Sequence, residues 1–305
     1  MEISYSNIDD IRNLPSEEVT LWVTPSCVET VKKHLPFIAT PVVEAISTKN
    51  LIVIGGGKYI DYAKIIRAKN FPDTKLIAAP SLWGSGSEAS PIALSDKDSK
   101  KEIFMGEEFT PDEVLLIPEL WTSISQEQSS WAIGDSWSHA LEGLLSPLND
   151  GSNKEAYYRV LKEMLYLAPS PSLDWFIASA KACKLQSKSG VGLIHGIAHS
   201  LEGIINKPNW GHARLCSTFL YPVMKYNALQ NCKFKNFMEE GGLDSNIVLT
   251  HLESMFNVQD YDETIPFLEQ NWKTILRDPC SRINCALVRP SALSFFTNKE
   301  FISND

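Results

Sequence analysis

The stretch NLIVIGGG at residues 50–57, followed by YIDYAKIIRAKN at 59–70 and KLIAAP at 75–80, decides the fold of the N-terminal part of the chain. The first and last segments are continuous apolar runs, which are typical of strands buried on both faces of a sheet. The middle segment has helical periodicity. A strand, a helix and a second strand in this order predict a parallel βαβ unit, with the three glycines at the turn from strand to helix.

Further strand and helix candidates surround this unit. VTLWVT at 19–24 is β-branched and aromatic, SCVETVKKHL at 26–35 is amphipathic, and PVVEAI at 41–46 has the composition of another short strand. Less regular strands are expected at PIALSD (91–96) and VLLIP (114–118). Strands that alternate with helices favour a parallel sheet covered on both faces.

The character of the chain changes after Pro118, where helical periodicity dominates and few strand signals follow. The helix candidates are SISQEQSSWAIGDSWSHALEGLL (123–145), EAYYRVLKEMLYLA (155–168), SLDWFIASAKACKLQ (172–186) and HGIAHSLEGII (195–205). A chain of this length is compatible with two domains or with one large domain. We expect two: an α/β domain over residues 1–122 and an all-helical domain over residues 123–305.

Composition excludes several classes of protein. Of the 305 residues, 44% are hydrophobic and 21% are charged, and the net charge of −9 with no basic stripe argues against a nucleic-acid partner. The six cysteines lack the paired spacing of a disulfide framework, so we expect reduced thiols and a cytoplasmic protein. The polar, acidic N-terminus is unlike a signal peptide, and no apolar run is long enough to span a membrane.

Histidines and one aspartate form a pattern that indicates a divalent-metal site. Asp135 and His139 are four residues apart in GDSWSHALE, His195 and His199 are four apart in HGIAH, and His212 follows in WGHAR. Residues four apart lie on one face of a helix, about 6 Å apart along its axis. Imidazole and carboxylate are ligands of iron(II) and zinc. Each histidine alone would fit a hydrogen-bonded core residue, but their co-occurrence favours a metal site.

Two glycine- and serine-rich loops follow neighbouring predicted strands. In GGGKYIDYAK (55–64) the glycines would let the backbone approach a phosphate, which the N-terminus of the next helix would attract. PSLWGSGSEAS (80–90) is the second loop, and two such loops at adjacent strand ends form a ligand-binding crevice. A plain tight turn and an irregular polar loop are the alternative interpretations. Lys58 could contact phosphate or solvent, and Asp61 could simply favour the helix N-terminus.

These motifs together resemble the iron-containing (group III) alcohol dehydrogenase family, which shares its fold with glycerol dehydrogenase and dehydroquinate synthase. The matching runs are GGG-x-x-x-D-x-A-K, P-S-x-x-G-S-G-S-E, G-D-x-x-x-H-A-x-E and H-G-I-A-H with a later histidine, in the family's order between residues 50 and 227. The resemblance implies an N-terminal dinucleotide-binding domain with a parallel sheet, a C-terminal helical metal-binding domain, and a site in the cleft.

The resemblance also implies roles for individual residues. Asp135, His139, His195 and His212 match the four metal ligands, and His199 matches a histidine that relays a proton. The positions that match cofactor contacts are Gly55, Gly56, Gly57, Lys58 and Asp61 in the pyrophosphate loop, Ser81 and Leu82 near the cofactor, and Lys101 near the ribose or nicotinamide. The implied cofactors are Fe²⁺ or Zn²⁺ and NAD or NADP.

The implied reaction is hydride transfer between a nicotinamide and a small alcohol, aldehyde or ketone. A divalent metal would polarise the substrate oxygen, the nicotinamide would carry the hydride, and His199 could pass the proton to solvent. The resemblance further implies a homo-oligomer, commonly a dimer.

Several positions depart from the family pattern. The chain is short between VTLWVT and GGGK, Pro25 stands roughly where an acidic residue would contact the ribose 2′-hydroxyl, and Ala213 replaces the glycine after the last histidine. The chain beyond about residue 230 also matches poorly. Two other functions therefore stay open: a noncatalytic, degenerate relative, and a dehydroquinate-synthase-like cyclase or lyase, against which GSGSEAS argues.

Overall fold

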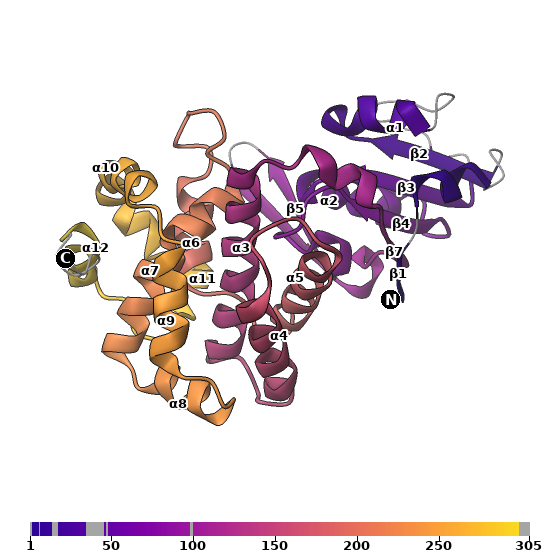
Figure 1. Ribbon diagram of the computed structural model, residues 1–305. Coiled ribbons are helices and arrows are strands. Elements are labelled where there is room, and N and C mark those ends of the chain that lie inside the picture. Colours follow the sequence, from indigo (N-terminus) through magenta and orange to yellow (C-terminus); the bar gives the residue numbers. More distant parts are fainter. Residues whose placement is uncertain are drawn as a thin grey trace. The chain divides into compact units, whose positions relative to one another are not determined.

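The computed structural model describes residues 2–5, 7–13, 18–34, 46, 48–97 and 100–298 (Figure 1). The chain packs as two compact units, the first formed by residues 1–125 and 171–184 and the second by residues 126–170 and 185–305. Among the described residues, no helix combines the length and the apolar character needed to cross a membrane.

A parallel five-stranded sheet forms the centre of the first unit. Its strands, in spatial order, are β1 (Glu2–Tyr5), β7 (Glu113–Leu116), β4 (Lys75–Pro80), β3 (Asn50–Gly55) and β2 (Val19–Val23). The central strands are apolar on both faces, as their continuous hydrophobic runs predicted, and residues 51–55 of β3 are all buried. Parallel neighbours need a crossover, and α2 (Gly57–Asn70) provides it between β3 and β4.

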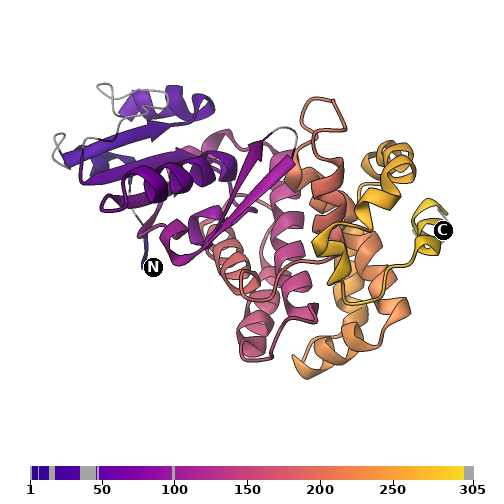
Figure 2. The ribbon, with the colours of Figure 1, turned by 180° about the vertical axis from the view of Figure 1, so that it is seen from behind.

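Smaller elements complete the first unit. They are α1 (Val28–His34), the antiparallel hairpin of β5 (Ile92–Lys97) and β6 (Lys100–Met105), and most of α5 (Leu173–Gln186). The hairpin is conspicuous in Figure 2, and α2 packs against β5 as well as against β3 and β4. The predicted strand PVVEAI lies outside the described residues except for Ile46, which is in no strand.

The second unit consists of helices over the residues described. They are α3 (Gln126–Leu145), α4 (Lys154–Tyr166), α6 (Leu193–Leu201), α7 (His212–Gln230), α8 (Lys233–Glu240), α9 (Ser245–Ser254), α10 (Val258–Ile275), α11 (Pro279–Arg282) and α12 (Leu293–Thr297). Helix α3 is the central element, because all its residues from Ala132 to Leu145 are buried. The predicted fold class, a parallel-sheet α/β part with a helical part, is confirmed.

Aromatic stacking explains why the segment 171–184 packs with the first unit. Trp83 follows β4, and its ring lies 6.4 Å from that of Trp175 and 5.4 Å from that of Phe176. Phe176 also stacks on Trp121 at 4.5 Å. Such pairs stabilise the fold beyond the area that they bury. The predicted boundary between residues 122 and 123 does not account for this return of the chain to the first unit. The domain boundary stays a prediction.

Candidate metal centre and nucleotide loops

Three helices of the second unit carry the predicted metal-binding side chains. Asp135 and His139 lie one turn apart on α3, and His195 and His199 lie one turn apart on α6. His212 is the first residue of α7, and Gly211 before it has an extended conformation. The spacing of four residues places each pair on one helix face, as the sequence predicted.

A glycine on α3 lets α7 approach closely. A Cβ atom added at Gly134 would lie 2.6 Å from the Cα of Ser217 on α7 and 2.5 Å from its Cβ. No larger residue fits between the two backbones here without a shift. The contact lies next to Asp135 on one helix and next to Cys216 on the other, so it brings these two side chains near each other.

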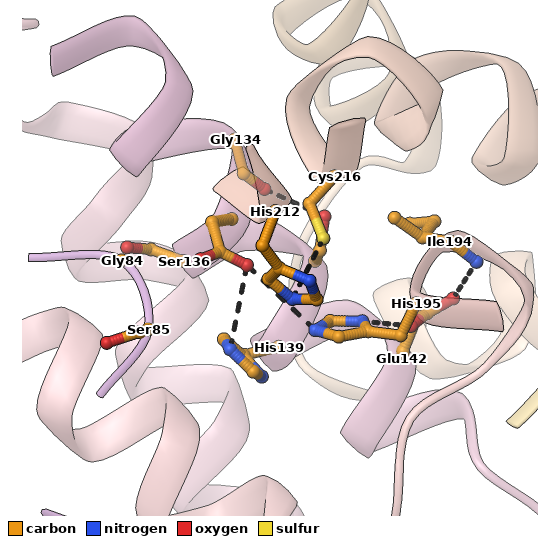
Figure 3. A network of polar contacts seen from close by, with 12 residues as sticks. Gly84, Ser85, Gly134, Ser136, His139, Glu142, Ile194, His195, His212 and Cys216 are labelled. Atoms are coloured by element: carbon orange, nitrogen blue, oxygen red, sulfur yellow. Dashed lines mark hydrogen bonds and ion pairs between the residues drawn. The ribbon is translucent and has the colours of Figure 1, made fainter. Parts of the chain in front are cut away.

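The side chains of His139, His195, His212 and Cys216 lie near one another (Figure 3). Asp135 Oδ1 lies 3.6 Å from His139 Nε2 and 3.9 Å from His195 Nε2. His212 Nε2 lies 3.5 Å from the Sγ of Cys216. One ligand atom from each of Asp135, His195, His212 and Cys216 lies within 4.8 Å of the other three. His139 is outside this group of four, although its ring centroid is 4.6 Å from that of His195.

This donor set fits a divalent cation. Asp135 is 1% exposed, and its Oδ1 accepts no hydrogen bond from any described residue. Leaving a buried carboxylate oxygen without a donor costs free energy that a cation would recover. Ligands about 2.1 Å from a tetrahedral metal lie roughly 3.4 Å apart, which is close to the separations found here. The structure therefore brings Asp135, His139, His195 and His212 together in an arrangement that can hold a metal.

Glu142 orients His195 from behind. Its Oε2 lies 2.7 Å from His195 Nδ1, and its Oε1 accepts a hydrogen bond of 2.6 Å from the backbone amide of Ile194. A proton on Nδ1 leaves the Nε2 lone pair available to a metal. Burial raises the pKa of Glu142 to about 7, against the opposing effect of backbone amides that include those of Ile194 and His195. No role for Glu142 was predicted from the sequence.

Burial also keeps His139 in the form that binds metals. Removal from water and the neighbouring His195 together lower the pKa of His139 to about 3, although Asp135 opposes the shift. A neutral imidazole has a free lone pair, whereas an imidazolium has none. His139 is therefore available as a ligand at neutral pH.

His199 lies beside the cluster and contacts a different pair of groups. Its Nδ1 is 3.8 Å from Oδ2 of Asp278 and 3.9 Å from Sγ of Cys280, and its ring centroid is 5.5 Å from that of His212. The pKa of Asp278 is lowered: burial raises it, but the hydrogen bond and charge of His199 and the amide of Cys280 outweigh burial. His199 is therefore paired with an anion, and its side chain is 16% exposed.

In the first unit, the two predicted nucleotide loops touch each other. Gly55 ends β3, Gly56 precedes α2 in an extended conformation, and Gly57 begins the helix. The amide of Ser81 donates a hydrogen bond of 2.9 Å to the carbonyl of Gly55. A Cβ atom at Gly57 would lie 2.4 Å from the Oγ of Ser85, so this glycine is required for the close approach. Leu82 is half-buried in the same loop.

The charged residues predicted near the cofactor lie in different surroundings. Lys58 is exposed in the first turn of α2. Asp61 is buried, and its carboxylate accepts from Lys64 Nζ at 3.1 Å, from the Leu94 amide at 3.1 Å and from the Ser87 hydroxyl. Asp61 thereby ties α2 to the loop that contains Ser87. Lys101 lies on β6 opposite Asp96, and its side chain is outside the described residues.

Comparison with solved structures identifies the fold. An iron-containing alcohol dehydrogenase from Thermococcus thioreducens aligns with a TM-score of 0.72 and 18% identity, covering 98% of this chain and 97% of that one. Sulfoacetaldehyde reductase from Bifidobacterium kashiwanohense, solved with NAD⁺, aligns with a TM-score of 0.73 and 18% identity, covering 100% and 97%. The chain has the fold of the iron-containing alcohol dehydrogenases.

Curated relatives point to the same family. The 1-propanol dehydrogenase PduQ of Salmonella typhimurium is 29% identical over 241 residues, which cover 72% of this chain and 63% of the relative. Aldehyde-alcohol dehydrogenase 2 of Entamoeba histolytica is 26% identical over 69% of this chain and 28% of its own length. The chain thus spans less than two thirds of these relatives. No protein-family model matches the chain. The resemblance to the iron-containing alcohol dehydrogenase family is confirmed.

Proposed function

We propose that this protein is a metal-dependent oxidoreductase that transfers hydride between NAD or NADP and a small alcohol, aldehyde or ketone. The observation that carries the proposal is the convergence of Asp135 Oδ1 with the imidazoles of His195 and His212, next to which His139 Nε2 lies 3.6 Å from the same oxygen. The relatives support the substrate class, because their names include a 1-propanol dehydrogenase and a 4-hydroxybutyrate dehydrogenase.

The four side chains would hold Fe²⁺ or Zn²⁺. When bound, such a cation acts as a Lewis acid on the substrate oxygen. Asp135 would supply the negative charge, and the imidazoles would supply neutral nitrogen donors. Glu142 holds the proton on His195 Nδ1 and so keeps Nε2 aimed at the other ligands.

His199 would carry the proton of the reaction. It would take the hydroxyl proton during alcohol oxidation and pass it to solvent, to which its side chain is partly exposed. The carboxylate of Asp278, 3.8 Å from Nδ1, would stabilise the charged ring. In aldehyde reduction the proton moves in the opposite direction.

The nucleotide would bind at the glycine turn and the loop after β4, in a dinucleotide-binding domain that we place at residues 1–122. The contributing positions are Gly55, Gly56, Gly57, Lys58, Asp61, Ser81, Leu82 and Lys101. The glycines would let the backbone approach the pyrophosphate, and the N-terminus of α2 would attract its charge. Asp61 would act by holding the Ser87 loop in place. We place the metal-binding domain at residues 123–305. We also propose that the protein is cytoplasmic and forms a homo-oligomer.

The test combines binding and turnover. Protein fluorescence is followed during NADH and NADPH titrations, bound metal is quantified, and a panel of small alcohols and aldehydes is assayed with both nicotinamides after anaerobic loading with Fe²⁺ or Zn²⁺. We expect about one metal per chain, saturable binding of at least one nicotinamide, and turnover. Metal binding without any nucleotide binding would overturn the proposal in favour of a noncatalytic relative.

A further inference from the structure

Cys216 occupies a position that the predicted ligand set does not include. It lies one helical turn after His212 on α7, it is fully buried, and its Sγ is 3.5 Å from His212 Nε2. Its sulfur also belongs to the group of four ligand atoms within 4.8 Å of one another, together with Asp135 and His195. His139, which the sequence predicted as a ligand, is not a member of this group.

Packing alone does not account for this placement. A buried cysteine usually behaves as a small apolar residue among apolar neighbours. Here the sulfur lies among a carboxylate and two imidazoles, and Asp135 Oδ1 accepts no hydrogen bond from the described residues. The close approach of α3 and α7 at Gly134 and Ser217 places the cysteine beside that carboxylate.

We propose that the thiolate of Cys216 is a further ligand of the metal, beside Asp135, His195 and His212, and that it adds to the donor set proposed above. The inference rests on the metal site proposed above. On coordination the thiol gives its proton to solvent and the sulfur donates a lone pair to the cation, without any change of oxidation state. Softer thiolate donors favour zinc over magnesium or manganese, so the cysteine shifts the metal preference of the site.

Cobalt(II) tests this assignment directly, because a thiolate bound to it gives a charge-transfer absorption in the near ultraviolet that oxygen and nitrogen ligands do not give. The full-length, metal-free protein is titrated with Co²⁺, and the visible d–d bands report occupancy independently of the ligand type. The variants are Cys216→Ser, which keeps the size of the side chain, and Cys232→Ser, an exposed control outside the cluster.

We expect the charge-transfer band in the native protein and in Cys232→Ser, and its loss in Cys216→Ser with the d–d bands retained. Stoichiometric Co²⁺ binding to the native protein without the band would overturn the cysteine assignment and leave the metal site standing. No Co²⁺ binding to the native protein would contradict the metal site itself. Circular dichroism of each variant establishes that the helices are intact.

Metal selectivity provides a second measurement that does not depend on turnover. Loss of a ligand is expected to weaken Zn²⁺ binding at least as much as loss of a supporting residue does, which is roughly 10–100-fold. The affinity for Mn²⁺, which gains little from a thiolate, is expected to change by less than about threefold in Cys216→Ser. An equal loss of affinity for Zn²⁺ and Mn²⁺ would contradict a coordinating sulfur and indicate a general distortion of the site.

Discussion

Glu142 Oε2 lies 2.7 Å from Nδ1 of His195, and the other oxygen of the same carboxylate accepts the amide proton of Ile194. The glutamate thus contacts both the ring and the backbone at the position that would bind the metal. A carboxylate behind a histidine ligand fixes the tautomer and increases the basicity of the metal-binding nitrogen.

Replacing Glu142 by glutamine should weaken metal binding without removing it. The amide keeps the size of the side chain and can still accept a hydrogen bond, but it loses the charge that makes His195 more basic. We expect the dissociation constant for Zn²⁺ to rise roughly 10–100-fold, measured by competition with a chromophoric chelator. An affinity equal to that of the native protein would show that Glu142 has only a packing role.

His195→Ala should abolish both metal binding and turnover. The change removes a donor whose Nε2 is 3.9 Å from Asp135 Oδ1 and leaves that buried carboxylate with fewer partners. Bound metal is quantified in the purified variant, and His34→Ala, on α1 in the first unit, is the matched control. Near-normal metal content in His195→Ala would defeat the ligand assignment.

Glu88 predicts a dependence of stability on pH in the first unit. This residue is 1% exposed, neither of its oxygens bonds to another described residue, and burial raises its pKa from 4.5 to about 7. Between pH 4.5 and 7 the unfolded chain releases the proton while the folded chain keeps it, so folding loses stability as the pH rises through this window. The loss at pH 8 should approach about 3 kcal/mol.

The measurement compares the native protein with Glu88→Gln, which is neutral at every pH. In urea unfolding at pH 5 and at pH 8, the free energy of unfolding of the variant should rise relative to that of the native protein at the higher pH. Because all other titrating groups are shared, the difference between the two proteins isolates Glu88. Two parallel stability curves would rule out a protonated glutamic acid at this position.

Gly134→Ala should destabilise the second unit even though alanine is the better helix former. The added methyl group would lie 2.6 Å from the Cα of Ser217, which is backbone and cannot rotate away. Overpacking of this kind costs about 1–3 kcal/mol after the gain in helix propensity, and metal affinity should fall with it. Gly56→Ala, with no atom within 4 Å of the new Cβ, is the control and should cost under about 1 kcal/mol.

Sequence periodicity predicted the features that depend on local spacing. The apolar runs at β3 and β4 and the helical pattern of α2 gave the parallel sheet, and spacings of four residues identified which side chains share a face of α3 and α6. Cys216 follows His212 at this same spacing, so the rule that found the other pairs would also have found the cysteine. The ligand roles themselves stay predictions.

Contacts between distant parts of the chain could not be predicted from the sequence. Glu142 contacts His195 across 53 positions, and Trp83 contacts Trp175 across an even longer stretch, so no local pattern records either contact. Asp61 illustrates a different difficulty. Its position in a glycine-rich motif suggested a role in the pyrophosphate loop or at the helix N-terminus. Its carboxylate instead accepts from Lys64 on the same helix and from the amide of Leu94, which only the folded β5 strand provides.

Because the donor atoms come from α3, α6 and α7, a bound cation would cross-link three helices and close the chain into two loops, from residue 135 to 195 and from 195 to 212. Closing such loops restricts the unfolded chain, and a ligand that binds only the native state adds its own binding free energy to folding. Removal of the cation by a chelator would then lower the stability of the helical unit as a whole and make it more susceptible to proteolysis. The parallel sheet of the first unit would stay resistant to proteases.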